Sequence, residues 1–438
     1  MLPFEEKFRN YLKKNAETVF MLLITLGGVA GRFFLWDIYT GDMGAYLKWY
    51  NRAKECGGLP GIYELGQRIK GYNALFQLLT AALTHIPVDP QYMFKIVWTV
   101  FDLLLAAGVG VLVYHLCTDG GKLPFRTAKN KSLDKPALRK AAIAYALSFM
   151  SMNVIFNSAA WGQSDAVYVS LIIWSLVWIL RDKPLKSFIL LGIAFAFKLQ
   201  TVFILPFFVF LYVYKKSFSC LYFLCLPAML FMSALPRQIV GLLSPMNVQA
   251  AGTAAGVAAK TTTAQGLPGI INVYIGQIAS GGRMYLEYPS FWAFFPNEDP
   301  DVFTDFYKFR NAAIVLTLMI LAALVYMLLK EERKFDNCRL MYAAMVLSFT
   351  TVYFLPTMID RYGYIYEILA IVLIFLDKRS IIPAALLHLV MFYQIAGRVG
   401  METLPVSMQQ LSFILLIIYG MYLYLLFGSR KEESNAGV

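Results

Sequence analysis

The stretch MFKIVWTVFDLLLAAGVGVLVYHLC, residues 93–117, decides how the rest of the chain is arranged. It is longer than the roughly 20 apolar residues that a helix needs to cross a lipid bilayer. A strongly basic loop follows it, made of Lys122, Arg126, Lys129, Lys131, Lys135, Arg139 and Lys140. Short basic loops of membrane proteins stay in the cytoplasm, so we expect this stretch to be a span that ends on the cytoplasmic side.

The apolar segment before this span, residues 73–86, is too short to cross a membrane. Counting it as a span would also place the basic loop outside, against the positive-inside rule. We therefore expect it to lie on the membrane surface as an interfacial helix, closed by Pro87 and Pro90.

The composition agrees with a membrane protein. The chain has 438 residues, of which 59% are hydrophobic and only 15% charged, and its mean hydropathy is +0.58. A soluble domain carries about 25% charged residues. The net charge of +12 is spread over short loops, which fits membrane topology better than a nucleic-acid partner. We expect an all-α polytopic membrane protein.

About twelve spans are expected, with both chain ends in the cytoplasm. They cover residues 19–36, 93–117, 141–157, 166–180, 187–197, 202–214, 218–235, 312–329, 340–355, 362–376, 381–395 and 411–427. The chain then divides into an N-terminal transmembrane module (1–236), which includes the first external loop (37–92), a long external loop (237–310) and C-terminal transmembrane helices (311–438). We expect neither a solenoid-type repeat nor a second soluble domain.

The long external loop has two parts of different composition. Residues 250–263 are rich in Ala, Gly and Thr and have little to bury, so we expect them to be mobile. Residues 288–295, YPSFWAFF, form an aromatic cluster suited to a membrane interface.

Neither a metal site nor a cofactor is expected. The five cysteines lie mostly within or beside apolar runs, and the three histidines are far apart, so no disulfide framework or metal pattern is readable. No cleavable signal peptide is expected either, because the first apolar segment continues without a small-residue cleavage site.

Asp42 is the candidate general base. It lies in the stretch WDIYTGDMGAY, residues 36–46, where the first span meets water, and glycines flank it. A side chain in such a flexible segment can be directed at a substrate. The alternative is that Asp37 and Asp42 are solvated loop residues or helix N-caps.

Lys198 lies between two short apolar segments, 187–197 and 202–214, which meet at a polar turn. Interrupted helices of this kind line cavities in membrane proteins. A lysine inside the membrane costs about 2.5–3.5 kcal/mol unless it is paired or hydrated. One explanation is that Lys198 and Arg361 together bind an anionic group such as a lipid phosphate. The other is that Lys198 reaches water or pairs with Asp165.

Three further residues, Trp161, Gln163 and Asp165, suit a sugar, because hydroxyls favour carboxylate and amide partners and a pyranose can lie on an indole ring. The alternative is a tight turn with Trp161 as an interface anchor. For Asp102, inside the second span, we favour a hydrogen bond between helices over a chemical role.

These residues resemble the GT-C superfamily of integral-membrane glycosyltransferases, in particular bacterial relatives of the GPI-anchor mannosyltransferases. The most specific pieces are NSAAWGQSD (157–165) and GIAFAFKLQ (192–200). Weaker ones are FDLL (101–104) and LP (355–356) leading to DRY (360–362). The resemblance covers about residues 20–400 and implies a GT-C type bundle with interfacial helices in the first external loop.

The chain departs from that pattern in two places. Relatives often have His-Glu-Arg-Tyr where this chain has Ile359-Asp360-Arg361-Tyr362, so any role of that histidine is absent. Some relatives have Asp-x-Asp in the first loop, whereas this chain has Gly41-Asp42-Met43-Gly44 at that place, so Asp42 would act alone. A metal-bridging pair of carboxylates is therefore not supported.

The resemblance implies transfer of a sugar, such as the hexose mannose, from a polyprenyl-phosphate donor to a hydroxyl of a glycan, lipid or protein acceptor, with inversion. Asp42 would be the base, and Lys198 and Arg361 would bind the donor phosphate. The remaining candidates for sugar or acceptor binding are Trp161, Gln163, Asp165, Gln200 and Tyr362. The site would face the outside of a prokaryotic plasma membrane, whose lipids are the other partners.

Two other classes of protein remain open. A transporter or lipid flippase also uses broken helices and buried charges, but it predicts symmetry between two halves, and none is visible in the sequence. A membrane scaffold leaves Lys198 and Arg361 without a purpose. Product formation from labelled donors would identify the enzyme, and counterflow without product would identify a transporter.

Overall fold

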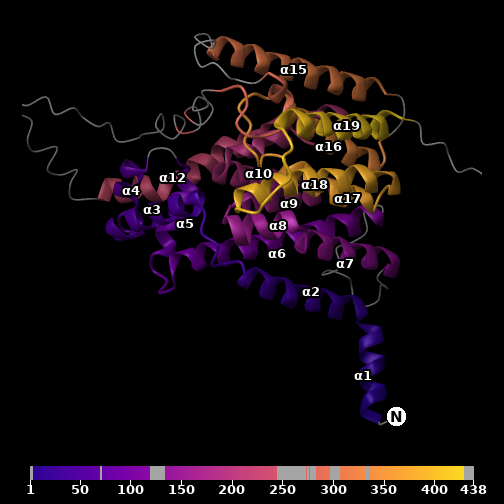
Figure 1. Ribbon diagram of the computed structural model, residues 1–438, viewed down its shortest axis with the longest axis horizontal. Coiled ribbons are helices and arrows are strands. Elements are labelled where there is room, and N and C mark those ends of the chain that lie inside the picture. The colour runs from indigo at the N-terminus through magenta and orange to yellow at the C-terminus, as the bar shows by residue number, and fades with distance from the viewer. Residues whose placement is uncertain are drawn as a thin grey trace, which may run out of the picture.

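The protein is a bundle of helices that lie side by side, with a small group of helices at one end (Figure 1). The computed structural model describes residues 3–69, 72–118, 134–243, 273, 276, 283–295, 306–331 and 335–428. The mobility expected for residues 250–263 concerns residues outside this part of the chain, and so does most of the basic loop after residue 117.

The bundle contains the segments that the sequence predicts as spans. Its helices are α2 (Ala16–Phe33), α6 (Pro90–Cys117), α7 (Lys135–Phe149), α9 (Asp165–Leu180), α10 (Pro184–Phe197), α11 (Leu205–Lys215), α12 (Cys225–Leu243), α15 (Phe306–Lys330), α16 (Asn337–Phe354), α17 (Tyr364–Ile374), α18 (Ile381–Arg398) and α19 (Met408–Phe427). The deciding stretch forms α6, which begins with Pro90 in its first turn and is capped by the Asp89 side chain. Each predicted span therefore overlaps a helix, but the span expected at 141–157 is broken after Phe149 and resumes at Met152.

Six helical stretches of the described chain are long and apolar enough to cross a membrane by length and composition, and a bent pair at residues 135–161 makes a seventh. They are Ala16–Phe33, Pro90–Cys117, Cys220–Leu243, Lys308–Lys330, Lys378–Arg398 and Met408–Phe427. These helices confirm an all-α polytopic membrane protein. Shorter helices such as α9, α10 and α17 account for other expected spans, so the number twelve stays a prediction.

The first external loop is helical. It forms α3 (Gly41–Glu55), α4 (Ile62–Arg68) and α5 (Ala74–Leu83), which gather at one end of the bundle (Figure 1). Helix α5 coincides with the expected interfacial helix. Asp42 accordingly lies in the first turn of a helix, where we expected a loose loop.

Helix α12 extends farther than predicted. We expected the seventh span to end at residue 235, before Pro236, but the helix continues to Leu243 with the proline inside it. The extension packs against α4 and α5, where the Arg237 side chain is buried. Tertiary packing therefore outweighs the tendency of proline to end a helix.

The aromatic cluster at 288–295 packs on the bundle. Its short helix η5 (Phe291–Phe294) lies against α19 and α16, and Tyr288 is fully buried. Trp292 Nε1 donates a hydrogen bond to the carbonyl of Phe354 at 2.7 Å. In the adjoining segment, Thr357 N donates to the Met284 carbonyl at 2.7 Å, so this part of the loop covers the turn that carries Arg361.

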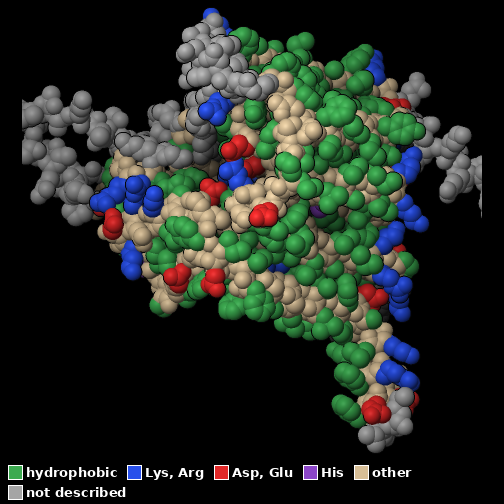
Figure 2. All heavy atoms as spheres, viewed as in Figure 1, with side chains coloured by type: hydrophobic (Ala, Val, Ile, Leu, Met, Phe, Trp, Pro, Cys, Tyr) green, Lys and Arg blue, Asp and Glu red, His purple; other side chains and the backbone are tan. Residues whose placement is uncertain are grey.

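Lysine and arginine side chains gather at the end of the bundle opposite α3–α5 (Figure 2). Turns and helix ends there contain Lys183, Lys215, Lys330 and Arg379, as the positive-inside reading predicts. The other end carries charges of both signs. The two ends of the bundle are therefore electrically different.

Candidate active site

A short π-helix, η2 (Phe156–Trp161), brings the predicted sugar-binding residues together at the end near α3. It continues the short helix α8 (Met152–Ile155), and the pair is bent by 46° relative to α7. Gly162 then adopts φ +82°, a left-handed conformation that glycine tolerates best. This turn points Gln163 and Asp165 back into the bundle.

A buried ion pair holds this π-helix against its neighbours. Arg32 Nε lies 2.9 Å from Asp102 Oδ2, and the Ser158 hydroxyl donates to the same oxygen at 2.5 Å. Arg32 and Asp102 are both fully buried. Asp102 thus makes hydrogen bonds between helices, in agreement with the interpretation that we favoured.

Asp42 is held beside the π-helix by two hydrogen bonds. Trp161 Nε1 and Gln163 Nε2 donate to its Oδ2 at 2.7 and 2.6 Å. Thr40 is the N-cap of α3, since its hydroxyl accepts from Met43 N, and it also donates to the Trp161 carbonyl at 2.7 Å. The N-cap alternative for Asp42 is therefore wrong, and the start of α3 is joined directly to η2.

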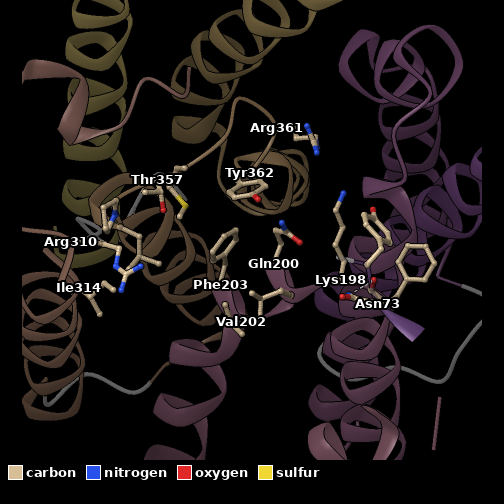
Figure 3. A pocket seen from close by; sticks show the side chains of 16 residues that line it. Asn73, Lys198, Gln200, Val202, Phe203, Arg310, Ile314, Thr357, Arg361 and Tyr362 are labelled. Atoms are coloured by element: carbon tan, nitrogen blue, oxygen red, sulfur yellow. Dashed lines mark hydrogen bonds between the residues drawn. The ribbon is translucent and has the colours of Figure 1, made fainter. Parts of the chain in front are cut away.

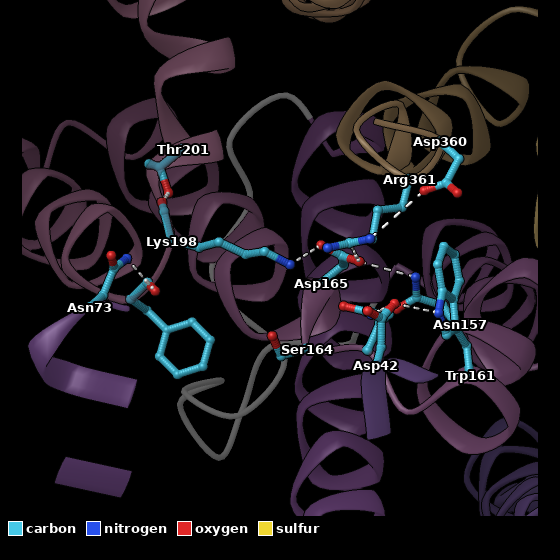
Figure 4. A network of polar contacts seen from close by, with 12 residues as sticks. Asp42, Asn73, Asn157, Trp161, Ser164, Asp165, Lys198, Thr201, Asp360 and Arg361 are labelled. Carbon is cyan, nitrogen blue, oxygen red and sulfur yellow. Dashed lines mark hydrogen bonds and ion pairs between the residues drawn. The ribbon is translucent and has the colours of Figure 1, made fainter. Parts of the chain in front are cut away.

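Lys198 lies where the sequence predicts a break. Its backbone is extended between α10 and the short helix η3 (Leu199–Ile204), and its side chain forms an ion pair with Asp165 Oδ1. Arg361 approaches Asp165 from the other side, with Nε 3.5 Å from Oδ2 (Figure 4). Asn157 Nδ2 donates to Oδ2 at 3.1 Å. The pairing of Lys198 with Asp165, the alternative above, is thus present, and the same carboxylate also contacts the second predicted cation.

Arg361 is fixed by two more neighbours. Its guanidinium carbon lies 5.3 Å from the centre of the Trp161 ring, a cation–π distance. Asp360 Oδ1 lies 3.7 Å from Arg361, and Asp360 Oδ2 pairs with Arg398. Burial raises the pKa of Asp360 to about 7, while the charge of Arg361 acts to lower it.

A cavity of about 440 Å³ opens next to these cations (Figure 3). Lys198 and Arg361 line it, together with the predicted residues Gln200 and Tyr362. Its other walls are largely apolar and include Val202, Phe203, Ile314, Leu355 and Met358. The cavity therefore offers cations and an apolar surface to the same ligand.

Asp42, Trp161, Gln163 and Asp165 do not line this cavity. They form the polar cluster on which Lys198 and Arg361 also converge (Figure 4). Trp161 and Gln163 have Asp42 as a partner, and Asp165 has the two cations. Their roles in sugar binding stay predictions.

Sequence reasoning missed several polar residues of this region. Arg310, from α15, lines the cavity, and Asn157 contacts Asp165. Arg32 and Lys95 are charged residues within predicted spans, and the rule that singled out Lys198 applies to both of them. That signal was present in the sequence.

A family model described as glycosyltransferase family 87 matches residues 72–356, which is more than half of the chain. The match includes Asp165 and Lys198, while Asp42 and Arg361 lie outside it. A search of curated proteins found no match.

Proposed function

The chain belongs to glycosyltransferase family 87, a membrane family of the GT-C type, and from this premise we propose that its donor is a sugar joined to a polyprenyl phosphate. The sugar is a hexose such as mannose, and the acceptor is a hydroxyl of a glycan, lipid or protein. The reaction proceeds with inversion on the external face of a prokaryotic plasma membrane, and both chain ends are cytoplasmic. Membership of a glycosyltransferase family argues against the transporter and scaffold alternatives.

One observation carries the proposal: Lys198 and Arg361 come from distant segments to a single cavity whose other walls are largely apolar. A lipid phosphate has the matching chemistry, since its oxygens pair with the two cations and its hydrocarbon chain lies on the apolar walls. Gln200 and Tyr362 are in the same lining, and we assign to them hydrogen bonds with the sugar or the acceptor.

Asp42 is proposed as the base because of how its carboxylate is held. Both hydrogen bonds end on Oδ2, so among the described residues Oδ1 is the oxygen left to take up a proton. The N–H groups of Trp161 and Gln163 fix its orientation, which a general base requires.

The proposed step is a direct displacement at the anomeric carbon. The acceptor oxygen forms a bond to that carbon while the bond to the phosphate oxygen breaks, and the bonding electrons leave with the polyprenyl phosphate. The acceptor proton passes to Asp42 Oδ1. Lys198 and Arg361 stabilise the charge that grows on the departing phosphate.

The purified protein in lipid nanodiscs, incubated with radiolabelled polyprenyl-phosphate hexoses and candidate acceptors, tests the proposal. We expect labelled glycosylated acceptor, with an anomeric configuration opposite to that of the donor. Transfer from nucleotide sugars alone, with none from the lipid-linked donors, would contradict the proposed donor.

Replacement of the base gives the sharper test. Asp42→Asn should lower turnover by about 10²–10⁴-fold and leave donor binding nearly unchanged, because a positioned base acts on the chemical step. Asp37→Asn is the matched control, since Asp37 lies in the same stretch but pairs with the Tyr92 hydroxyl. Full activity of Asp42→Asn, or equal losses in both variants, would exclude Asp42 as the base.

A further inference from the structure

Helix α1 (Pro3–Lys14) has an exposed aromatic stripe that nothing in the described protein covers. Phe4, Phe8 and Tyr11 are 76%, 52% and 61% exposed, and the rings of Phe4 and Phe8 stack with their centres 6.2 Å apart. Their spacing of four and three residues places them on one face of the helix. The opposite face and its edges carry the basic residues.

The direction of α1 differs from that of the bundle. It turns away from α2 at Asn15 and lies across the direction in which the other helices run (Figure 1). If the bundle helices cross the membrane, α1 lies parallel to the membrane surface. It does so at the end of the bundle where lysine and arginine gather (Figure 2).

The apolar and basic faces of α1 point in opposite directions along the axis of the bundle helices. In Figure 2 the hydrophobic side chains of α1 lie on its left side, in the direction of the α3–α5 end, and its Lys and Arg side chains lie on the right. Neighbouring α2 presents Leu22, Leu23 and Leu26, each more than half exposed, as expected of a surface in contact with lipid. The aromatic stripe is therefore level with the edge of a lipid-facing surface.

We propose that α1 is an in-plane membrane helix that binds anionic lipid headgroups of the leaflet at the basic end of the bundle. Its aromatic stripe enters the boundary between headgroups and hydrocarbon. Its four cations, Lys7, Arg9, Lys13 and Lys14, outnumber Glu5 and Glu6 and contact the lipid phosphates. This surface is separate from the catalytic cavity and does not depend on the proposed donor.

Spin labels at two positions test the depth of the helix. Full-length protein without its native cysteines is reconstituted into phosphatidylcholine vesicles with and without phosphatidylglycerol. The label is attached through Phe8→Cys or, as the matched position on the other face, Lys13→Cys. We expect the label at position 8 to collide mainly with dissolved oxygen and the label at 13 mainly with a water-soluble nickel chelate.

Two results would overturn the in-plane helix. Labels accessible to nickel at both positions would place α1 in water. A label at position 8 shielded from both reagents would mean that protein, such as a second copy of the chain, covers the stripe.

The role of charge is tested by Lys13→Gln with Lys14→Gln. In vesicles with phosphatidylglycerol, the ratio of membrane-inserted to water-exposed α1, measured with the label at position 8, should fall about fivefold for each cation removed. Lys215→Gln with Lys216→Gln is the matched control, because that pair ends α11 at the same end of the bundle. If α1 with all its lysines inserts equally well with and without phosphatidylglycerol, anionic lipid is excluded as the partner.

Discussion

The carboxylate of Asp165 is fully buried and contacts Lys198, Arg361 and Asn157 at once. Arg361 also has Asp360 at 3.7 Å, whereas Asp165 is the carboxylate that both cations share. A buried cation without a partner costs several kcal/mol, so Asp165 offsets part of the cost of burying both cations. A donor phosphate would add a further negative partner for them.

Lys198→Ala should therefore weaken donor binding by about tenfold or more, the value of one hydrogen bond between charged groups. Lys198→Arg should restore most of the affinity. Binding of radiolabelled donor in nanodiscs measures both. Lys186→Ala is the matched control, because Lys186 lies near the other end of α10 and packs over Trp178. Unchanged donor affinity in Lys198→Ala would argue against the phosphate site.

Lys95 positions the segment that leads to Asp42. Its side chain is fully buried, and Nζ donates hydrogen bonds to the carbonyls of Leu35, Trp36 and Ile38 at 3.4, 2.9 and 2.6 Å. These carbonyls follow the end of α2, where a cation is favourable.

Lys95→Met removes all three bonds and should lower kcat about tenfold while the Kd of the donor stays constant, because only the path to the base is loosened. Steady-state kinetics combined with donor binding separate the two quantities. The exposed Lys48→Met on α3 serves as control. A loss of donor affinity without a change in kcat would contradict this role.

Sequence reasoning identified Lys198 because a lysine at that depth is costly, and the structure shows it paired. Arg32 and Lys95 satisfy the same criterion, but we did not apply it to them. The sequence predicted Lys198 beside Arg361 and, as the alternative, beside Asp165, but not that both cations share Asp165, because that depends on how η3 and the turn before α17 pack in three dimensions.

At the level of elements, the predicted spans overlap helices because apolar length is a strong signal, but the bend within 141–157 was not predicted. The stretch around Asp42 in the first external loop was misread as loose. Its helix α3 has buried Met43, Tyr46, Tyr50 and Ala53, a spacing typical of an amphipathic helix. Polar residues lie between these positions, so the helical spacing was overlooked in the sequence. The extension of α12 past Pro236 could not be predicted, since it depends on contacts with α4.

The turn at Gly162 joins the π-helix to α9 and also contacts the start of α3. A Cβ at Gly162 would lie 2.3 Å from the terminal methyl carbon of Met43, next to Asp42. Gly162→Ala should therefore cost about 1–2 kcal/mol for the left-handed backbone and, in addition, force the buried Met43 side chain to move beside the base. Tm and turnover should both fall.

Gly400→Ala is the matched control, because Gly400 has a similar φ of +80° and nothing within 4 Å of the added Cβ. It should lower Tm by a comparable amount with little effect on turnover. Equal losses of turnover in the two variants would show that the contact with Met43 is unimportant for catalysis.

For the molecule as a whole, the difference in charge between its two ends predicts its orientation. Cys220 is exposed at the basic end, and Lys48 is exposed on α3 at the other. In right-side-out vesicles, a membrane-impermeant maleimide should label Lys48→Cys and leave Cys220 unlabelled, with the other cysteines replaced. Inside-out vesicles should give the reverse. Labelling of Cys220 from outside would invert the proposed topology.

The pairing of Asp165 with both cations has a consequence for selectivity. Inorganic phosphate, sugar phosphates and nucleotide sugars bring negative charge but no long hydrocarbon chain, and the two cations that would bind this charge are already paired with Asp165. A polyprenyl chain gains about 0.8 kcal/mol for each methylene that it buries in the bilayer, which concentrates a lipid-linked donor in the membrane beside the cavity. The site then selects lipid-linked donors over water-soluble metabolites by free energy rather than by shape, and no moving segment has to close it.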